Sequence, residues 1–194
     1  VAGGGMIEGD HFVFACGPWM GRMFPDVIGR RIVATRQEVF FFGTPPGDTR
    51  HGENSQLPAW VHMADRVVYG VPDNERRGLK IADDSAGPEV DPSLLNRDPS
   101  ADGLARAREI LRERFPALAS APLLEARVCQ YEASSDGNFL VDRHPALGNV
   151  WLVGGGSGHG FKMGPALGEH VAALVSGRAQ GEPLFSYTRL RPRE

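Results

Sequence analysis

Cysteine is scarce in this chain, which has Cys16 and Cys129 among its 194 residues. Two cysteines are too few for the dense disulfide framework of a small secreted domain, so they favour a reducing compartment. No apolar stretch approaches the roughly 20 residues that a membrane-spanning helix needs. No basic segment followed by an apolar one marks a secretory signal. These absences predict a soluble, cytoplasmic protein.

Strong net charge is absent as well. The formal charge of -3 gives no reason to expect nucleic acid or an anionic membrane as a partner. His51, His62, His144 and His170 have no metal-ligand spacing, so we expect no metal site. The hydrophobic content of 41% and the charged content of 23% are typical of a globular protein with one generous domain or two small ones.

A glycine-rich segment, GGGSGHG (154–160), is present, but it fits neither of two familiar motifs. A nucleophile elbow needs Gly two residues on either side of the Ser, and His159 follows Ser157 at that distance. A dinucleotide fingerprint that begins at Gly154 would need Gly at position 159. Pro165 then suits the first position of a helix that runs to about Ser176, whose N–H groups can hold an anion. The segment therefore predicts a cradle of another kind for a polar cofactor.

The rest of the chain reads as strands and turns with one further helix. We expect strands over 11–16, 30–43, 78–83, 123–133, 139–142 and 149–153, with a hairpin over 59–72. Ser100 is a suitable N-cap for a helix over 101–114, which Pro116 ends. Within 123–133, side chains alternate between two faces, so Arg127, Cys129 and Tyr131 should share one face.

Three blocks of residues resemble the flavin-dependent amine oxidases of the D-amino-acid oxidase superfamily, nearest the branch of monomeric sarcosine oxidase and N-methyltryptophan oxidase. The first is FACGPW (14–19), similar to the segment where a sheet of that family's FAD domain meets the flavin. The second is YGVPDNERRGLK (69–80), similar to a Tyr-Gly-x-Pro stretch ending in Gly-Leu-Lys. The third joins CQY (129–131) to FLVDRHP (139–145) and SGHGFK (157–162). The resemblance spans residues 10–176 and covers only the C-terminal half of such an enzyme.

The resemblance implies roles for individual residues. Cys129 matches the cysteine that bonds covalently to the flavin 8α-methyl group, and Lys80 matches the lysine that activates oxygen. Lys162 matches a lysine that helps to hold the substrate carboxylate. The implied catalytic residues are Lys80, Lys162, Tyr69, Tyr131 and His159. The implied cofactor-binding residues are Cys129, Gly17, Trp19, Gly155, Gly156, Ser157, Gly158, His159, Gly160, Phe161 and Lys162.

The implied fold is α+β. We expect a remnant of an FAD-binding domain over 1–29, a substrate-binding domain of mostly antiparallel sheet with one helix over 30–128, and a return to the FAD-binding, glutathione-reductase-like domain over 129–194. The family's ADP-binding βαβ unit, with its G-x-G-x-x-G turn, is absent from the sequence. We therefore expect the first strand to expose an unpaired edge and the chain alone to bind FAD poorly. A missing N-terminal half or a partner chain would complete it.

The implied reaction oxidises the C–N bond of a secondary amine or amino acid by hydride transfer to flavin, with oxygen as the acceptor and hydrogen peroxide as a product. The alternatives are a non-catalytic subunit that binds flavin or assists assembly, and a dehydrogenase with another electron acceptor. Three positions depart from the sarcosine oxidase pattern. Asp84 replaces a histidine, Glu132 a threonine and Gly156 a phenylalanine. These changes alter the polarity of the implied pocket and argue against sarcosine itself as the substrate.

Overall fold

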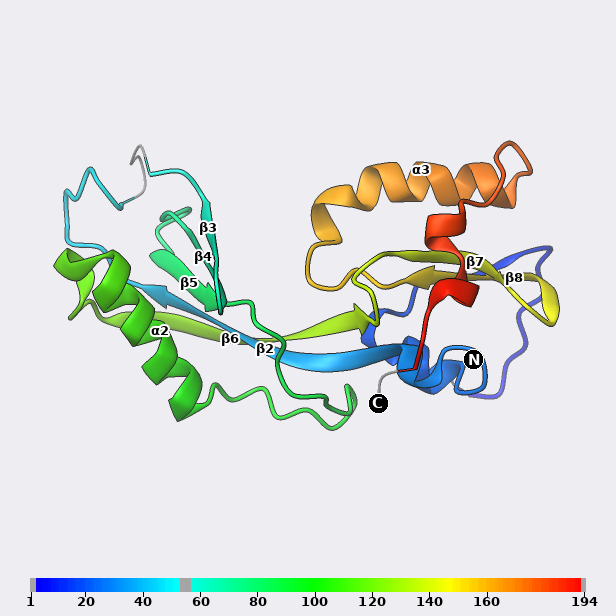
Figure 1. Ribbon diagram of the computed structural model, residues 1–194, viewed down its shortest axis with the longest axis horizontal. Coiled ribbons are helices and arrows are strands. Elements are labelled where there is room, and N and C mark those ends of the chain that lie inside the picture. Colours follow the sequence, from blue (N-terminus) through cyan, green and yellow to red (C-terminus); the bar gives the residue numbers. More distant parts are fainter. Residues whose placement is uncertain (1–2, 53–56, 193–194) are drawn as a thin grey trace. The chain divides into compact units, whose positions relative to one another are not determined.

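The computed structural model describes residues 3–52 and 57–192 and shows a mixed α+β chain (Figure 1). The predicted strands and helices are confirmed, with ends that differ by a few residues. The strands are β1 (Phe12–Phe14), β2 (Ile32–Phe42), β3 (Trp60–Met63), β4 (Val67–Val71), β5 (Leu79–Asp83), β6 (Leu123–Ser134), β7 (Leu140–His144) and β8 (Leu147–Gly154). The helices are α1 (Met20–Met23), α2 (Ala101–Arg114) and α3 (Gly164–Val175).

The chain divides into two compact units, and the division falls within β2 and β6. Unit 1 takes its described residues from 1–35, 90–92 and 131–194. Unit 2 takes its described residues from 36–89 and 93–130. Each unit has its own hydrophobic core, so each is described by itself.

Unit 1 contains a three-stranded sheet in the order β1-β8-β7. β1 runs parallel to β8, and β7 runs antiparallel to β8. The alternation of side chains along β8 gives the sheet two apolar faces, since Leu152 packs with Met20 while Trp151 and Val153 pack with Leu174 of α3. β1 lies at an edge of this sheet among the described strands, as the sequence predicted.

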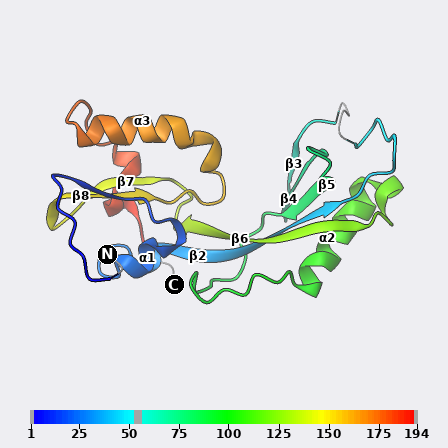
Figure 2. The same ribbon diagram turned by 180° about the vertical axis from the view of Figure 1, so that it is seen from behind.

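Unit 2 is built on a five-stranded sheet in the order β3-β4-β5-β2-β6. The β3–β4, β4–β5 and β5–β2 pairs are antiparallel. α2 covers one face of this sheet (Figures 1 and 2), where Phe42, Leu79 and Ile81 pack against Ala107 and Leu111. A smaller apolar cluster lies on the face that α2 leaves uncovered.

The start of α2 is closed by side chains of its own unit. The Ser100 hydroxyl accepts a hydrogen bond from the Gly103 backbone N–H at 2.9 Å, which confirms the predicted cap. The same hydroxyl donates to the Glu38 carboxylate on β2 at 2.7 Å. The cap therefore fixes the helix to the sheet beneath it.

Candidate functional site

The glycine-rich turn of unit 1 follows β8 and leads into α3. Gly155 and Gly158 have φ angles of 73° and 84°, and Ser157 has a φ of 45°. These angles lie in the left-handed region that glycine adopts readily and other residues rarely do. The glycines at 155 and 158 are therefore a backbone requirement of this turn.

Ser157 holds its unusual conformation through hydrogen bonds to β6. Its N–H donates to the Glu132 carbonyl at 3.0 Å, and its hydroxyl accepts from the Ser134 N–H at 3.2 Å. The hydroxyl also donates to the Gly155 carbonyl at 3.1 Å. This network fastens the turn to the end of β6.

His159 and Lys162 both bond to backbone carbonyls near the turn. The His159 Nε2 lies 2.9 Å from the Gly137 carbonyl oxygen, so that nitrogen must carry a proton and donate. The His159 ring also meets the Phe139 ring edge-to-face, with the centroids 5.5 Å apart. The Lys162 ammonium donates to the His159 carbonyl at 3.3 Å. These contacts keep an imidazole and a cation at the start of the α3 segment.

Glu132 is a half-buried residue beneath the turn. Its Oε1 accepts from the Gly156 N–H at 3.3 Å, while its Oε2 is buried and has no hydrogen-bond partner among the described residues. Burial raises the pKa of Glu132, although the backbone N–H groups of Gly156 and Gly155 act in the opposite direction. A Cβ added at Gly154 would lie 2.8 Å from Oε2, so glycine at 154 makes room for this carboxyl.

Residues 16–20 lie beside the same carboxyl. Burial, and then the charge of Glu132, raise the pKa of the Cys16 thiol. Gly17 has a φ of 54° with open space where a Cβ would stand, and Trp19 is 38% exposed. The structure thus brings two predicted cofactor-binding residues, Gly17 and Trp19, into the unit that holds the turn.

α3 begins directly after a 3-10 helix over Phe161–Met163, and the Gly164 N–H donates to the Phe161 carbonyl. Pro165 occupies the first turn as predicted, no side chain caps the helix, and its first turn contains no acidic residue. Phe161 is fully exposed and Met163 is 46% exposed just before it. A helix start with no acidic residue, beside exposed apolar side chains, suits a flat aromatic ligand with anionic character. The residues of unit 1 therefore fit a flavin.

In unit 2, three of the predicted residues share the sheet face that α2 leaves uncovered. Tyr69 and Cys129 pack in the apolar cluster of Val39, Phe41 and Ala82. The Lys80 ammonium lies 4.9 Å from the centre of the Tyr69 ring. We call this surface the Cys129 face. Cys129 is a free thiol and is partly accessible.

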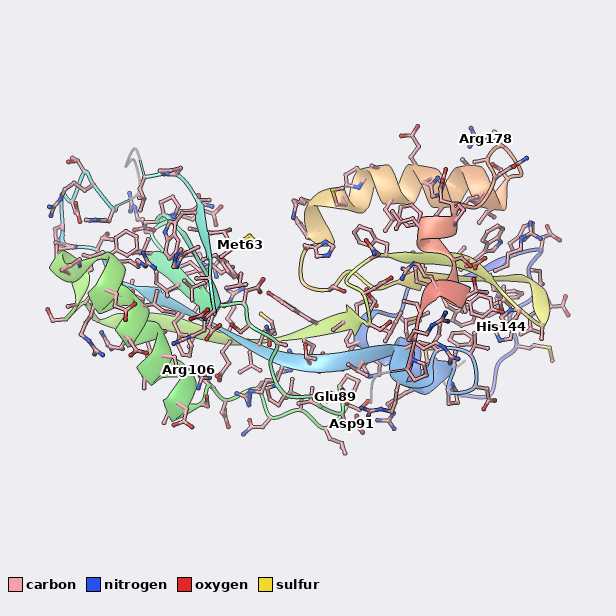
Figure 3. All side chains as sticks on the ribbon, in the orientation of Figure 1. Met63, Glu89, Asp91, Arg106, His144 and Arg178 are labelled. Atoms are coloured by element: carbon pink, nitrogen blue, oxygen red, sulfur yellow. The ribbon has the colours of Figure 1, made fainter. Side chains whose placement is uncertain are left out.

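The Cys129 face extends to the edge strand β3. Val61 is paired with Tyr69 in the ladder, so their side chains point to the same side. Val61 and Met63 are 62% and 79% exposed, and Figure 3 shows Met63 on β3. This part of the face is apolar and accessible in unit 2.

A charged cluster lies at the other side of the same face. The Arg77 guanidinium is 4.5 Å from the centre of the Phe41 ring, and it pairs with Glu125 of β6 at 3.2 Å. Arg127 also bonds to Glu125. The hydrogen bond from Arg127, followed by that from Arg77, lowers the pKa of Glu125, so this carboxyl is an anion shared by two cations.

The predicted residues thus form two groups. Tyr131 joins the turn residues in unit 1, because a Cβ at Gly158 would run into the Tyr131 ring. Tyr69, Lys80 and Cys129 form the second group in unit 2. In the sequence, Glu132 stands out only as a departure from a family pattern, and nothing in the local pattern marks Arg77. The available signal for Glu132 was an acidic residue within the predicted strand over 123–133.

Comparisons with known proteins identify the family. A family model described as FAD dependent oxidoreductase matches residues 2–174, so the chain belongs to this family. Monomeric sarcosine oxidase of Bacillus sp. (strain NS-129) is 30% identical over 191 residues, a match that covers 95% of this chain and 49% of the relative. N-methyl-L-tryptophan oxidase of Yersinia pestis (strain Pestoides F) is 30% identical over 198 residues, covering 96% and 50%.

A solved structure supports the fold. Fructosyl amine: oxygen oxidoreductase (Amadoriase I) from Aspergillus fumigatus superposes with a TM-score of 0.79 at 24% identity, covering 98% of this chain and 45% of that one. This chain spans about half the length of the curated relatives that it matches. Within residues 3–52 and 57–192, no helix is long and apolar enough to cross a membrane. The same residues hold no group of three or more His, Cys, Asp or Glu side chains that could bind a metal ion.

Proposed function

We propose that this chain is the C-terminal half of an FAD-dependent oxidoreductase that oxidises the C–N bond of a secondary amine or amino acid. The observation that carries the proposal is the grouping of Cys129, Tyr69 and Lys80 on one uncovered sheet face, in a chain that belongs to the FAD dependent oxidoreductase family. Bound FAD supplies a two-electron acceptor. A secondary amine, oxygen and water would give a primary amine, an aldehyde and hydrogen peroxide.

The residues of unit 1 would hold the flavin. The turn from Gly155 to Lys162 leads into α3, whose first turn has no side-chain cap and no acidic residue, and the positive end of the helix favours negative charge on a ligand. Trp19 and Phe161 offer exposed aromatic surface, and Gly17, just before Trp19 in the chain, has open space where a Cβ would stand. The ADP half of the cofactor needs a βαβ unit that this sequence lacks, so we propose that a further segment or a partner chain supplies it.

The Cys129 face of unit 2 would contribute the chemistry. The accessible Cys129 thiol is the proposed point of covalent attachment for FAD. Lys80 would place a positive charge where oxygen is reduced, and the Tyr69 ring holds its ammonium in position. On this face, Tyr69 would line the substrate site. In unit 1, the proposed roles are substrate contact for Tyr131, fixing the turn for His159 and holding a substrate carboxylate for Lys162. We propose that the enzyme acts in the cytoplasm.

Flavin retention tests the covalent link. The protein expressed from its complete reading frame is denatured in acid and separated from free flavin, and the flavin fluorescence of the polypeptide is measured. We expect the wild type to keep its flavin and Cys129→Ser to release it, while Cys16→Ser serves as the matched thiol control and keeps it. Flavin released by the wild type would contradict covalent attachment, and a wild type without any flavin would contradict the role of FAD.

Turnover tests the reaction class. Hydrogen peroxide is measured with a panel of N-methyl and cyclic amino acids, and with an artificial electron acceptor in place of oxygen. Peroxide from at least one amine supports the oxidase. Turnover with the artificial acceptor alone identifies a dehydrogenase, and no turnover from a flavin-loaded protein contradicts catalysis.

A further inference from the structure

The arginine–glutamate cluster on the Cys129 face has no part in the reaction described above. Arg77 lies over Phe41, and Phe41 is the ladder partner of Lys80. Directly paired residues of neighbouring strands project to the same side of a sheet. Arg77 and Lys80 therefore lie on the same side of the sheet, with the guanidinium over Phe41 and the ammonium over Tyr69.

The backbone just before Arg77 is strained. Glu75 and Arg76 have φ angles of 57° and 58°, and two consecutive non-glycine residues in the left-handed region are costly. The Asp73 carboxylate accepts from the Gly78 N–H at 2.9 Å and closes the turn. Strain of this kind persists where the surrounding structure fixes it, and here it sets Arg77 over the sheet.

Positive charge exceeds negative charge in this cluster. Three cationic side chains lie on this face, those of Arg77, Lys80 and Arg127. The carboxylate of Glu125 bonds to both arginines. Arg77 donates to Glu125 through Nε and Nη2 at 3.2 to 3.3 Å, and its side chain is 35% exposed. Its Nη1 has no hydrogen-bond partner among the described residues, so this side of the guanidinium can donate to another carboxylate.

We propose that Arg77 determines specificity by binding a second acidic group of the substrate. Its preferred substrates are then amines that bear two carboxylates, with the remote one at Arg77 and Glu125 competing for the same guanidinium. This inference rests on the proposed function, because it takes the Cys129 face as the substrate side of an oxidoreductase.

Binding of simple carboxylates to the chain tests this inference without turnover. Calorimetry compares glutarate, which has two carboxylates, with butyrate, which has one. We expect Arg77→Gln to weaken glutarate binding about fivefold, the size of one partly exposed ion pair, and to leave butyrate binding nearly unchanged. Glu125→Gln removes the competing carboxylate, so it should tighten glutarate binding.

The matched control is Arg143→Gln. Arg143 also stacks on an aromatic ring, with its guanidinium 4.6 Å from the centre of Trp151, but it belongs to unit 1. Its loss should leave glutarate binding unchanged. Equal binding of glutarate by wild type and Arg77→Gln, or weaker binding by Glu125→Gln, would overturn the inference. If Arg77→Gln does not fold, glutarate binding by Glu125→Gln still tests the inference.

Turnover by the complete protein separates this inference from the proposed function. N-methylglutamate and N-methylalanine differ in the remote carboxylate, so their ratio of kcat/KM measures its contribution. We expect the ratio to favour N-methylglutamate and to fall about fivefold in Arg77→Gln. Turnover of both amines at a ratio that Arg77→Gln leaves unchanged overturns the inference and leaves the function standing. If a flavin-loaded protein turns over neither amine, the wider amine panel tests the function, and the glutarate result still tests Arg77.

Discussion

The two long helices of this chain begin in opposite ways. α2 starts at Ser100, whose hydroxyl accepts from the Gly103 N–H and donates to Glu38, and Asp102 adds a negative charge in its first turn. α3 starts behind Met163 with no side-chain cap and no acidic residue in its first turn. Every helix leaves N–H groups unpaired at its start. In α2 the Ser100 hydroxyl meets part of this need, whereas in α3 no side chain takes part: the Gly164 N–H donates to the Phe161 carbonyl, and Pro165 has no N–H.

The contrast extends to the glycines near each start. A Cβ at Gly103 would run into the Glu38 carboxylate, so the start of α2 is filled. A Cβ at Gly164 or Gly168 would meet nothing within 4 Å. The filled start of α2 belongs to a helix that packs on the core of unit 2, and we propose that the start of α3, beside exposed Phe161, meets the flavin.

Opening the start of α2 should have the largest effect. Ser100→Ala removes the cap of Gly103 and one of the bonds to Glu38, so we expect the free energy of unfolding to fall by about 1 to 2 kcal/mol. Urea denaturation followed by circular dichroism measures the change. Ser176→Ala is the control, since that hydroxyl bonds to the Ala172 carbonyl at the exposed end of α3 and its loss should cost less than about 0.5 kcal/mol. Equal losses in the two variants would remove the distinction between the helix starts.

Closing the start of α3 should have a smaller effect on stability and the opposite effect on the ligand. Ala166 is exposed in the first turn, so Ala166→Glu places a negative charge at the positive end of the helix. We expect the chain to gain about 0.3 to 1 kcal/mol of stability. The complete protein should bind FAD more weakly, because the new carboxylate competes with the anionic part of the flavin.

Ala166→Gln is the matched neutral control for this exchange. It should change neither quantity appreciably, and a fluorescence titration with FAD provides the affinity. Unchanged FAD affinity in Ala166→Glu would mean that the flavin does not meet the α3 start. A gain in stability with no change in affinity would therefore separate the electrostatics of the helix from the proposed cofactor role.

Local patterns predicted most elements of both units. The Ser100 cap and the alternation along 123–133 depend on neighbours in sequence, and both were confirmed, with Ala126 on the α2 side of the sheet and Cys129 on the other. The grouping of Tyr69, Lys80 and Cys129 depends on the register of several strands. The residues came from a family resemblance, and only the structure shows that they share one face.

Glu132 and Arg77 could not be placed from sequence. The environment of Glu132 comes from Gly154 and Gly156, more than twenty positions along the chain, which approach closely because they lack side chains. Arg77 depends on left-handed angles at Glu75 and Arg76, residue types that give no signal for such angles. Both therefore arise from tertiary contacts that local rules do not encode.

The carboxyl of Glu132 in unit 1 provides the last and smallest test. In unit 2, by contrast, Glu125 is an anion shared by two arginines, and its pKa is lowered. The pKa of Glu132 is raised in the folded chain, so between the unfolded value and that raised value the folded state holds the proton more tightly. The stabilisation is fully present below the unfolded value and is lost as the pH rises through the folded value. We expect the melting temperature of the wild type to fall across this window more steeply than that of Glu132→Gln, which has no proton to lose. Glu132→Asp keeps a titratable group and should keep the slope. Parallel pH profiles of wild type and Glu132→Gln would show that Glu132 ionises as freely in the folded chain as in the unfolded one, and the contrast between the two carboxyls would then be lost.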